Sequence, residues 1–165
     1  MSVFKKVVLS SAVLMGMALS AGANAAVTTV SWEGEVPGSI GDGTHLITGE
    51  NGDLTALYGV IQPNADGQFV SEAIKLESYV DNGGTIGEAT PVNWQVEAFS
   101  VTYDNAEVDS QLVTAVIDGD DYAVGDSTGE KDNISVQIKQ EAQLTAEEVA
   151  GKTVKASLTL VTSVV

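Results

Sequence analysis

Residues 92–103 read VNWQVEAFSVTY, a stretch in which apolar and polar side chains alternate. The apolar residues of the first half occupy even-numbered positions: Val92, Trp94, Val96 and Ala98. Those of the second half occupy odd-numbered positions: Phe99, Val101 and Tyr103. Because successive side chains of a strand point to opposite faces, a slip of one residue turns every later side chain over. One extra residue explains the switch. We therefore predict a β-bulge near Ala98 and a bent strand that serves both halves of the core.

Other stretches show the same alternation and are rich in Val, Ile and Thr, which favour strands. They are residues 28–36, 54–61, 68–80, 111–117, 134–142 and 153–165. Gly- and Asp-rich segments, which we predict to be turns and loops, separate them at 38–43, 49–53, 81–87 and 118–133. Strands at this spacing, with no internal repeat and no linker, predict a single all-β domain built as an antiparallel β-sandwich.

A short helix is predicted between the last two strands. In LTAEEVAG, residues 144–151, Thr145 suits the N-cap position and Glu148, three residues later, completes a capping box. Leu144 and Val149 have the spacing of a hydrophobic staple, and Gly151 suits the left-handed residue that follows a helix. These signals predict one or two helical turns.

The first 25 residues have the features of a secretory signal peptide. Lys5 and Lys6 precede an apolar run over residues 7–19, and Ala23 and Ala25 supply the small residues of a cleavage site. The apolar run is too short to span a bilayer. We therefore expect a secreted mature chain that begins at Ala26.

The mature chain would be strongly acidic. Five lysines face 23 acidic residues once Lys5 and Lys6 are removed, a formal charge of 5 − 23 = −18, and the chain has no Arg. Such a charge repels phosphate backbones, so no nucleic-acid partner is expected. The absence of Cys excludes disulfides, thiolate metal sites and Cys nucleophiles. With His45 as the single His, most metal and proton-transfer chemistry lacks its commonest residue.

Catalytic motifs are weak in this sequence. Residues 125–129 match G-x-S-x-G around Ser127, but that motif requires a His later in the chain, and His45 lies upstream. No carboxylate pair suited to glycoside hydrolysis stands out among the acidic residues. We therefore expect no catalytic residue, no enzyme activity and no cofactor, and we interpret His45 as a surface residue beside a turn.

The acidic segment 118–133 is the candidate for Ca²⁺ binding, because hard cations prefer several carboxylates on one loop. Its acidic residues are Asp118, Asp120, Asp121, Asp126, Glu130 and Asp132. The spacing does not match an EF-hand, since Tyr122 and Ala123 occupy the fifth and sixth positions. We predict a solvated loop and assign no metal ligand.

Two alternating segments lie near the ends of the expected mature chain. Residues 28–36 begin close to the cleavage site and are followed by Pro37. Residues 153–165 alternate to the last residue, and no later strand follows to cover them. An uncovered strand edge is a template for a strand from another chain. We therefore expect the two ends to be where the chain binds its partners.

The signal peptide, the pattern Val30-x-Trp32-x-Gly34-x-Val36-Pro37, the turn 145–151 and the final strand together resemble a major pilin subunit of the chaperone–usher fimbriae. The likeness is to the alternate class found in colonisation-factor pili of enteric bacteria. The resemblance implies an immunoglobulin-like sandwich that lacks its last strand. A periplasmic chaperone fills the gap, and the N-terminal extension of the next subunit later replaces it. The absence of Cys and of a Tyr near the C-terminus departs from the commoner class and fits the alternate one.

The resemblance also implies site residues and partners. The donor-strand residues would be Thr28, Val30, Trp32, Gly34 and Val36. The acceptor groove would be lined by Val154, Ala156, Leu158, Leu160, Thr162 and Val164. The chain would divide into a signal peptide (1–25), a donor-strand extension (26–37) and a pilin domain (38–165). The implied partners are copies of the chain, the periplasmic chaperone, the outer-membrane usher and a receptor on the host surface.

The function implied by the resemblance is structural. The chain would pass through the periplasm and polymerise by donor-strand exchange into an adhesive fimbria, or pilus, that supports adhesion or biofilm formation. Its length leaves no room for a separate binding domain, which favours the shaft over the tip. Two alternatives stay open: residues 28–36 could be an ordinary first strand of a complete sandwich, or the chain could be a secreted acidic binding or biofilm-matrix protein with 118–133 as its Ca²⁺ site.

Overall fold

The computed structural model describes residues 30–31, 45–53 and 57–163. These residues form strands with little helix, and every strand pairing is antiparallel, which confirms the all-β class. The strands are β1 (Val30–Ser31), β2 (His45–Gly49), β3 (Val60–Ile61), β4 (Phe69–Val70), β5 (Ile74–Asp81), β6 (Ile86–Ala89), β7 (Val92–Tyr103), β8 (Val113–Ile117), β9 (Asp120–Tyr122), β10 (Ser127–Lys131), β11 (Asn133–Gln140) and β12 (Val154–Ser163). The helical elements are the 3-10 turn η1 (Glu50–Gly52) and α1 (Ala146–Val149).

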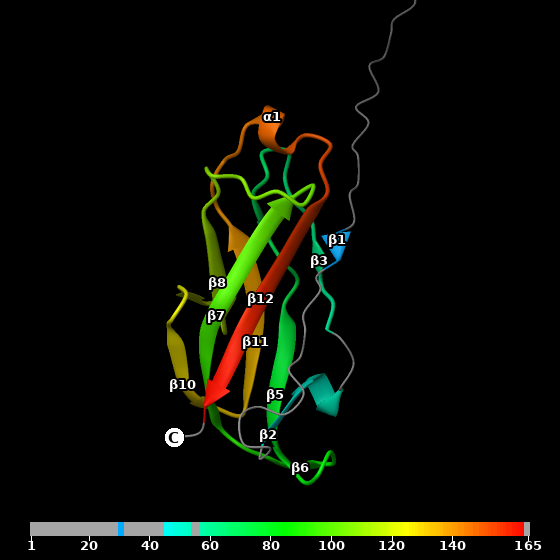
Figure 1. The fold of residues 1–165 in the computed structure, drawn as a ribbon, viewed down its shortest axis with the longest axis vertical. Helices are drawn as coiled ribbons and strands as arrows, with labels where there is room; N and C mark the ends of the chain where they lie inside the picture. Colours follow the sequence, from blue (N-terminus) through cyan, green and yellow to red (C-terminus); the bar gives the residue numbers. More distant parts are fainter. Residues whose placement is uncertain (1–29, 32–44, 54–56, 164–165) are drawn as a thin grey trace, which may run out of the picture.

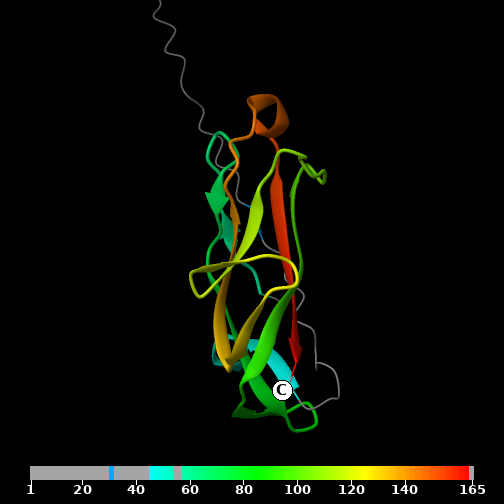
Figure 2. The same cartoon turned by 90° about the vertical axis from the view of Figure 1, so that its left-hand side faces the viewer.

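The strands form two facing layers, an arrangement compatible with a β-sandwich (Figures 1 and 2). The larger layer has the order β2-β5-β11-β8-β9, with β6 paired to β5 and β4 paired to β11. The smaller layer has the order β10-β7-β12, and β1 and β3 form a separate two-stranded sheet. Figure 1 shows α1 at one end of the long axis and β6 at the other.

The core between the layers divides into two clusters of buried side chains. The cluster at the α1 end includes Val101 and Tyr103 of β7. The other cluster includes Val92, Trp94 and Val96 of the same strand. Both clusters draw on the two layers, so β7 holds the two halves of the core together. The partly buried side chains that pack against both clusters are Ile74, Phe99 and Leu158.

The predicted bulge in β7 is confirmed. Thr159 of β12 pairs with Ala98, and Leu160 pairs with Val96, so Glu97 has no partner on β12. This extra residue lets β7 bury one parity before the bulge and the opposite parity after it. Ala98 was expected on the buried face with Val96, but it is exposed. The buried face therefore changes before Ala98 rather than after it.

The segment 118–133, which we predicted as a loop, contains two strands. β9 extends the larger layer beside β8, and β10 pairs with β7 in the smaller layer. The β8–β9 connection is a two-residue turn, Asp118-Gly119, with positive φ angles of 53° and 93°. Two such residues are typical of the type I′ hairpin turn, and Asp-Gly is one of its strongest sequence signals. The prediction was wrong because it relied on the acidic composition of the segment and did not use the Asp-Gly turn signal.

The strand β2 was also missed, and it begins at His45. Leu46, Ile47 and Thr48 are all buried, although they point alternately to opposite faces. A strand covered on both faces shows no polar alternation, so its periodicity gives no signal.

The helix α1 agrees with its predicted cap. The backbone N–H of Thr145 donates to Glu148 Oε2 at 2.7 Å, and the Thr145 hydroxyl donates to the same oxygen at 2.8 Å. These bonds lower the pKa of Glu148. Leu144 and Val149 are buried together in the core cluster at this end, and Gly151 has a φ of 73°, as a left-handed helix stop requires.

Candidate functional site

The strand β12 lies at an edge of the smaller layer. All ten of its residues pair with β7, from Val154 opposite Tyr103 to Ser163 opposite Asn93. Within the described residues, no strand pairs with its other side. We call this side of β12 the open edge. An edge of this length presents a row of backbone groups that can accept a further strand.

The side chains of β12 alternate between the interior and solvent. The inward row contains five of the six predicted acceptor residues: Val154, Ala156 and Thr162 are buried, and Leu158 and Leu160 are partly buried. Val164, the sixth, lies outside the described residues. The outward row is exposed and consists of Lys155, Ser157, Thr159, Val161 and Ser163.

The least buried part of the inward row lies over the junction of the two core clusters. Leu158 pairs with Phe99, and both side chains pack against both clusters. Leu160 packs against the cluster that contains Trp94. The centre of β12 therefore has apolar side chains that its own fold covers only in part, whereas both ends of the inward row are fully covered.

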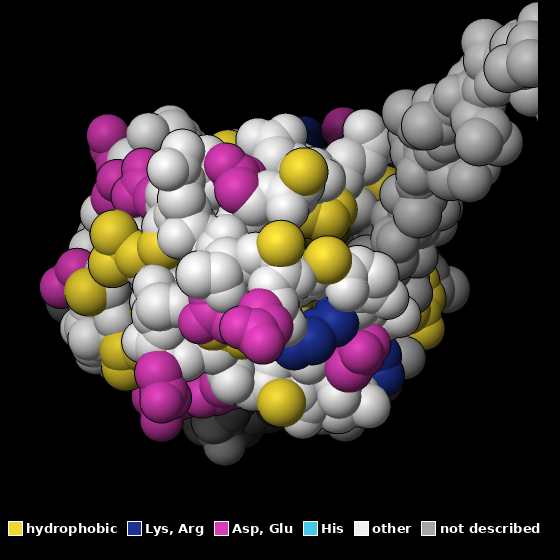
Figure 3. Space-filling model, turned by 90° about the horizontal axis from the view of Figure 1, so that it is seen from above, with side chains coloured by type: hydrophobic (Ala, Val, Ile, Leu, Met, Phe, Trp, Pro, Cys, Tyr) yellow, Lys and Arg dark blue, Asp and Glu magenta, His cyan; other side chains and the backbone are white. Residues whose placement is uncertain are grey.

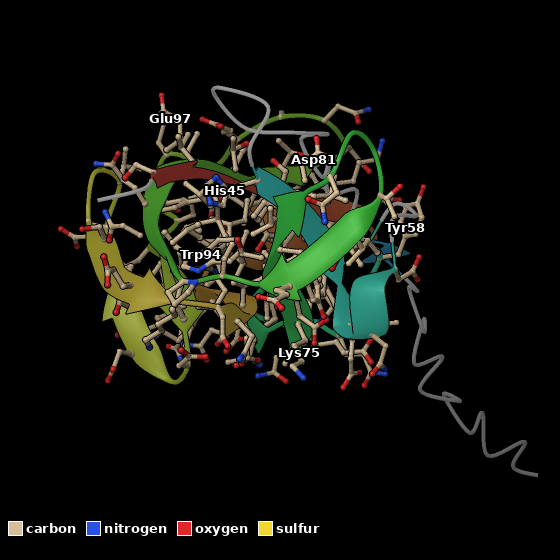
Figure 4. The ribbon with its side chains drawn as sticks, turned by 90° about the horizontal axis from the view of Figure 1, so that it is seen from below. His45, Tyr58, Lys75, Asp81, Trp94 and Glu97 are labelled. Atoms are coloured by element: carbon tan, nitrogen blue, oxygen red, sulfur yellow. The ribbon has the colours of Figure 1, made fainter. Side chains whose placement is uncertain are left out.

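The bulge leaves the backbone of β12 regular. Glu97, the extra residue, belongs to β7, so the inward row of β12 keeps one parity over all ten residues. In Figure 4, seen from below, Glu97 and Lys75 point away from the interior on opposite sides of the molecule. The change of register thus lies in β7, and an incoming strand could pair with β12 without a bulge of its own.

Of the predicted donor residues, only Val30 is described. It lies in β1 and pairs with Ile61 of β3, while Ser31 pairs with Val60. Thr28, Trp32, Gly34 and Val36 lie outside the described residues. β1 also comes within 8 Å of β12 between Cα atoms, so it lies near the open edge.

The neighbour of β1 is β3, a pairing that the sequence did not indicate. A strand was predicted over 54–61, but nothing in the alternation indicated its partner. The Val60 backbone N–H donates to Glu72 Oε2 at 3.1 Å, and the Glu72 N–H donates to the Val60 carbonyl at 2.9 Å. The backbone N–H and carbonyl of Val60 thus bond to Glu72 on one side of β3, and β1 lies on the other side of β3.

Two aspartates of the acidic segment 118–133 form ion pairs with lysines. Lys131 Nζ lies 2.6 Å from Asp118 Oδ2, and Lys139 Nζ lies 2.8 Å from Asp121 Oδ2. Burial raises the pKa of Asp118, but hydrogen bonds from Lys131 and from the Ser135 backbone, with the charge of Lys131, outweigh it and lower the pKa. No group of three or more potential metal ligands occurs among the described residues. Figure 3, seen from the α1 end, shows acidic side chains spread over that face.

Ser127 and His45 lie in different layers. Ser127 begins β10 and pairs with Gln95, whereas His45 begins β2 and pairs with Val80. The absence of enzyme activity stays a prediction.

Comparison with known proteins found no matching family model, no matching curated protein and no matching solved structure. In the described part of the chain, no helix is long and apolar enough to cross a membrane.

Proposed function

We propose that this chain is a structural subunit of a bacterial surface filament, similar to the major pilins of chaperone–usher fimbriae. The observation that carries the proposal is the open edge of β12: ten residues paired on one side only, with partly covered Leu158 and Leu160 at the centre. Strand addition at such an edge combines backbone hydrogen bonds with side-chain burial. A second copy of the chain supplies the added strand, and repetition of this contact gives a polymer.

The order of strands supports an immunoglobulin-like sandwich that lacks its last strand. β5, β11 and β8 are neighbours in one layer, while β7 and β12 are neighbours in the other. A fourth strand beside β12 would complete the smaller layer of such a sandwich. In our proposal, residues 28–36 of the next copy supply that strand.

The energetics favour a persistent contact. The ten residues of β12 extend about 33 Å, which is enough to pair with a nine-residue donor such as 28–36, about 30 Å long. Burial of Val30, Trp32 and Val36 would contribute about 5 to 9 kcal/mol before the cost of ordering the strand. The whole donor must leave at once for the copies to separate, so the filament would persist for kinetic reasons.

Before assembly, the open edge needs a temporary partner. An exposed strand edge with apolar side chains beneath it promotes unspecific association. A periplasmic chaperone would cover the edge during export, and an outer-membrane usher would then guide the exchange for a donor strand. The filament would serve adhesion or biofilm formation at the cell surface.

A fusion of the donor strand to the C-terminus tests the proposal. A copy of residues 28–36 is joined after Val165 through a flexible linker, and a matched control carries the same residues in scrambled order. We expect the fusion to be a monomer with a raised melting temperature, and the unfused chain to self-associate into filaments visible by electron microscopy. An unfused chain that is a stable monomer, with a melting temperature equal to that of the fusion, would contradict the proposal.

A further inference from the structure

The N-terminal strand β1 already pairs with β3 of its own chain. The two residue pairs, Val30 with Ile61 and Ser31 with Val60, are antiparallel. Ile61 is fully buried in the core cluster at the α1 end. Figure 1 shows β1 and β3 together beside the upper part of β12. One end of the space next to the open edge is therefore occupied by the backbone of the same chain.

We propose that the pairing of β1 with β3 restrains assembly: it holds the N-terminal strand within its own chain and competes with donation to a second copy. This inference rests on the proposed function, because it concerns the control of the same edge. A segment tethered to its site has an effective concentration of about millimolar, so the intrachain contact forms first in a dilute protein.

The restraint is built to be reversible. Within the described residues, β1 and β3 contribute two residues each, whereas β12 offers ten. Pairing of the N-terminal strand with the ten-residue open edge of a second copy therefore replaces the short intrachain contact when copies are concentrated. The chain would release its N-terminal strand at the site of assembly and retain it elsewhere.

The backbone geometry identifies a pair of residues suited to a test. The N–H and carbonyl of Val60 both bond to Glu72, so those of the next residue, Ile61, face β1. Ser31 and Val60 are thus a non-hydrogen-bonded pair, in which Cα atoms lie about 4.5 Å apart. This spacing is within the range that a disulfide spans, roughly 4.4 to 6.8 Å. Val60 is 40% exposed, and the chain has no other Cys to interfere.

The experiment is a disulfide trap in the full chain, secreted and purified. One variant carries Ser31→Cys with Val60→Cys. The matched control carries Ser31→Cys with Val124→Cys, because Val124 is also exposed, at 57%, but precedes β10 at the opposite edge of the smaller layer. After mild oxidation, intrachain and interchain disulfides are separated by non-reducing electrophoresis. Assembly is then followed by light scattering, with and without a reducing agent.

We expect the Ser31/Val60 variant to form at least about tenfold more intrachain disulfide than the control, at a yield unchanged by dilution. Its oxidised form should assemble at least about tenfold more slowly than its reduced form. Equal trapping in the two variants, or equal assembly before and after reduction, would overturn the inference. Strong intrachain trapping with no filaments from the reduced or unmodified chain would instead overturn the proposed function, and the restraint with it.

Discussion

The hydroxyl of Tyr103, at the end of β7, donates a hydrogen bond to the backbone carbonyl oxygen of Gly67 at 2.9 Å. Gln140 Nε2 donates to the same oxygen at 3.3 Å, and both side chains are almost fully buried. Burial raises the pKa of Tyr103, so its hydroxyl keeps the proton that it donates. This buried polar contact joins the two layers at the α1 end and holds the turn before β4 against the core.

Gly67 should therefore tolerate no side chain. It has a φ of +81°, and an added Cβ would lie 3.0 Å from Leu144 Cδ1 and 3.2 Å from the Tyr103 hydroxyl oxygen. We expect Gly67→Ala to lower the free energy of unfolding by more than the 1 to 3 kcal/mol, roughly, of backbone strain alone. The control is Gly129→Ala, with a φ of +79° and open space around it. Urea unfolding measures both, and equal losses would contradict the role of crowding at Gly67.

The unpaired Glu97 should matter for its backbone and not for its side chain. Without Glu97, the side chains of β7 would alternate without a break along the whole strand. The strand would also lose the bend that a bulge produces, and with it the fit of Trp94 and Tyr103 in their separate core clusters. We expect the deletion variant to lose its near-ultraviolet circular dichroism and its cooperative unfolding. Glu97→Ala, at an exposed position, should change stability by less than about 0.5 kcal/mol. A deletion variant as stable as the Ala variant would show that the bulge is dispensable.

The proposed acceptor role of β12 predicts a contrast between neighbouring residues. Leu160 points inward and is partly buried, whereas Thr159 points to solvent. We expect Leu160→Asp to reduce filament yield by at least about tenfold, because a buried unpaired carboxylate is costly when a donor strand covers it. Thr159→Asp should assemble normally. Far-ultraviolet circular dichroism establishes that both variants fold, and a folded Leu160→Asp protein that forms filaments at the normal yield would refute the assignment.

The Asp118–Lys131 ion pair predicts part of the acid sensitivity. A carboxylate whose pKa is lowered by folding stabilises the protein above its unfolded pKa, and this contribution is lost as the pH falls through the folded value. We expect the free energy of unfolding to decline less steeply below about pH 4 for Asp118→Asn than for the wild type. At pH 7 the variant should be the less stable protein. Asn also tolerates the positive φ at this position, so backbone strain does not obscure the comparison.

Lys131→Gln provides an independent check of the same pair. It removes the cation that holds the pKa of Asp118 down, so it should flatten the same part of the pH profile. Urea unfolding from pH 7 to about pH 2 measures all three proteins. Parallel profiles for the wild type and both variants would show that this pair contributes nothing to acid sensitivity.

The sequence by itself determined the features that depend on near neighbours. The two parities of 92–103 required an extra residue, and the structure has it at Glu97, one position before the predicted residue. Thr145 and Glu148 bond within a single turn, so their cap could also be read from four consecutive residues. Such signals are local because period-two alternation and helix capping involve residues within a few positions of each other.

Only the tertiary structure decided which strands lie side by side. Thr162 lies opposite Trp94, and Val30 opposite Ile61, although no pattern in the sequence relates these positions. The same holds for β2, which is covered on both faces, and for β10, whose exposed polar residues gain their order from pairing with β7. The physical reason is that a strand's alternation specifies which face is buried, whereas its neighbours depend on contacts between residues far apart in the chain. The position of β12 at an edge is therefore a property of the whole arrangement and not of its own residues.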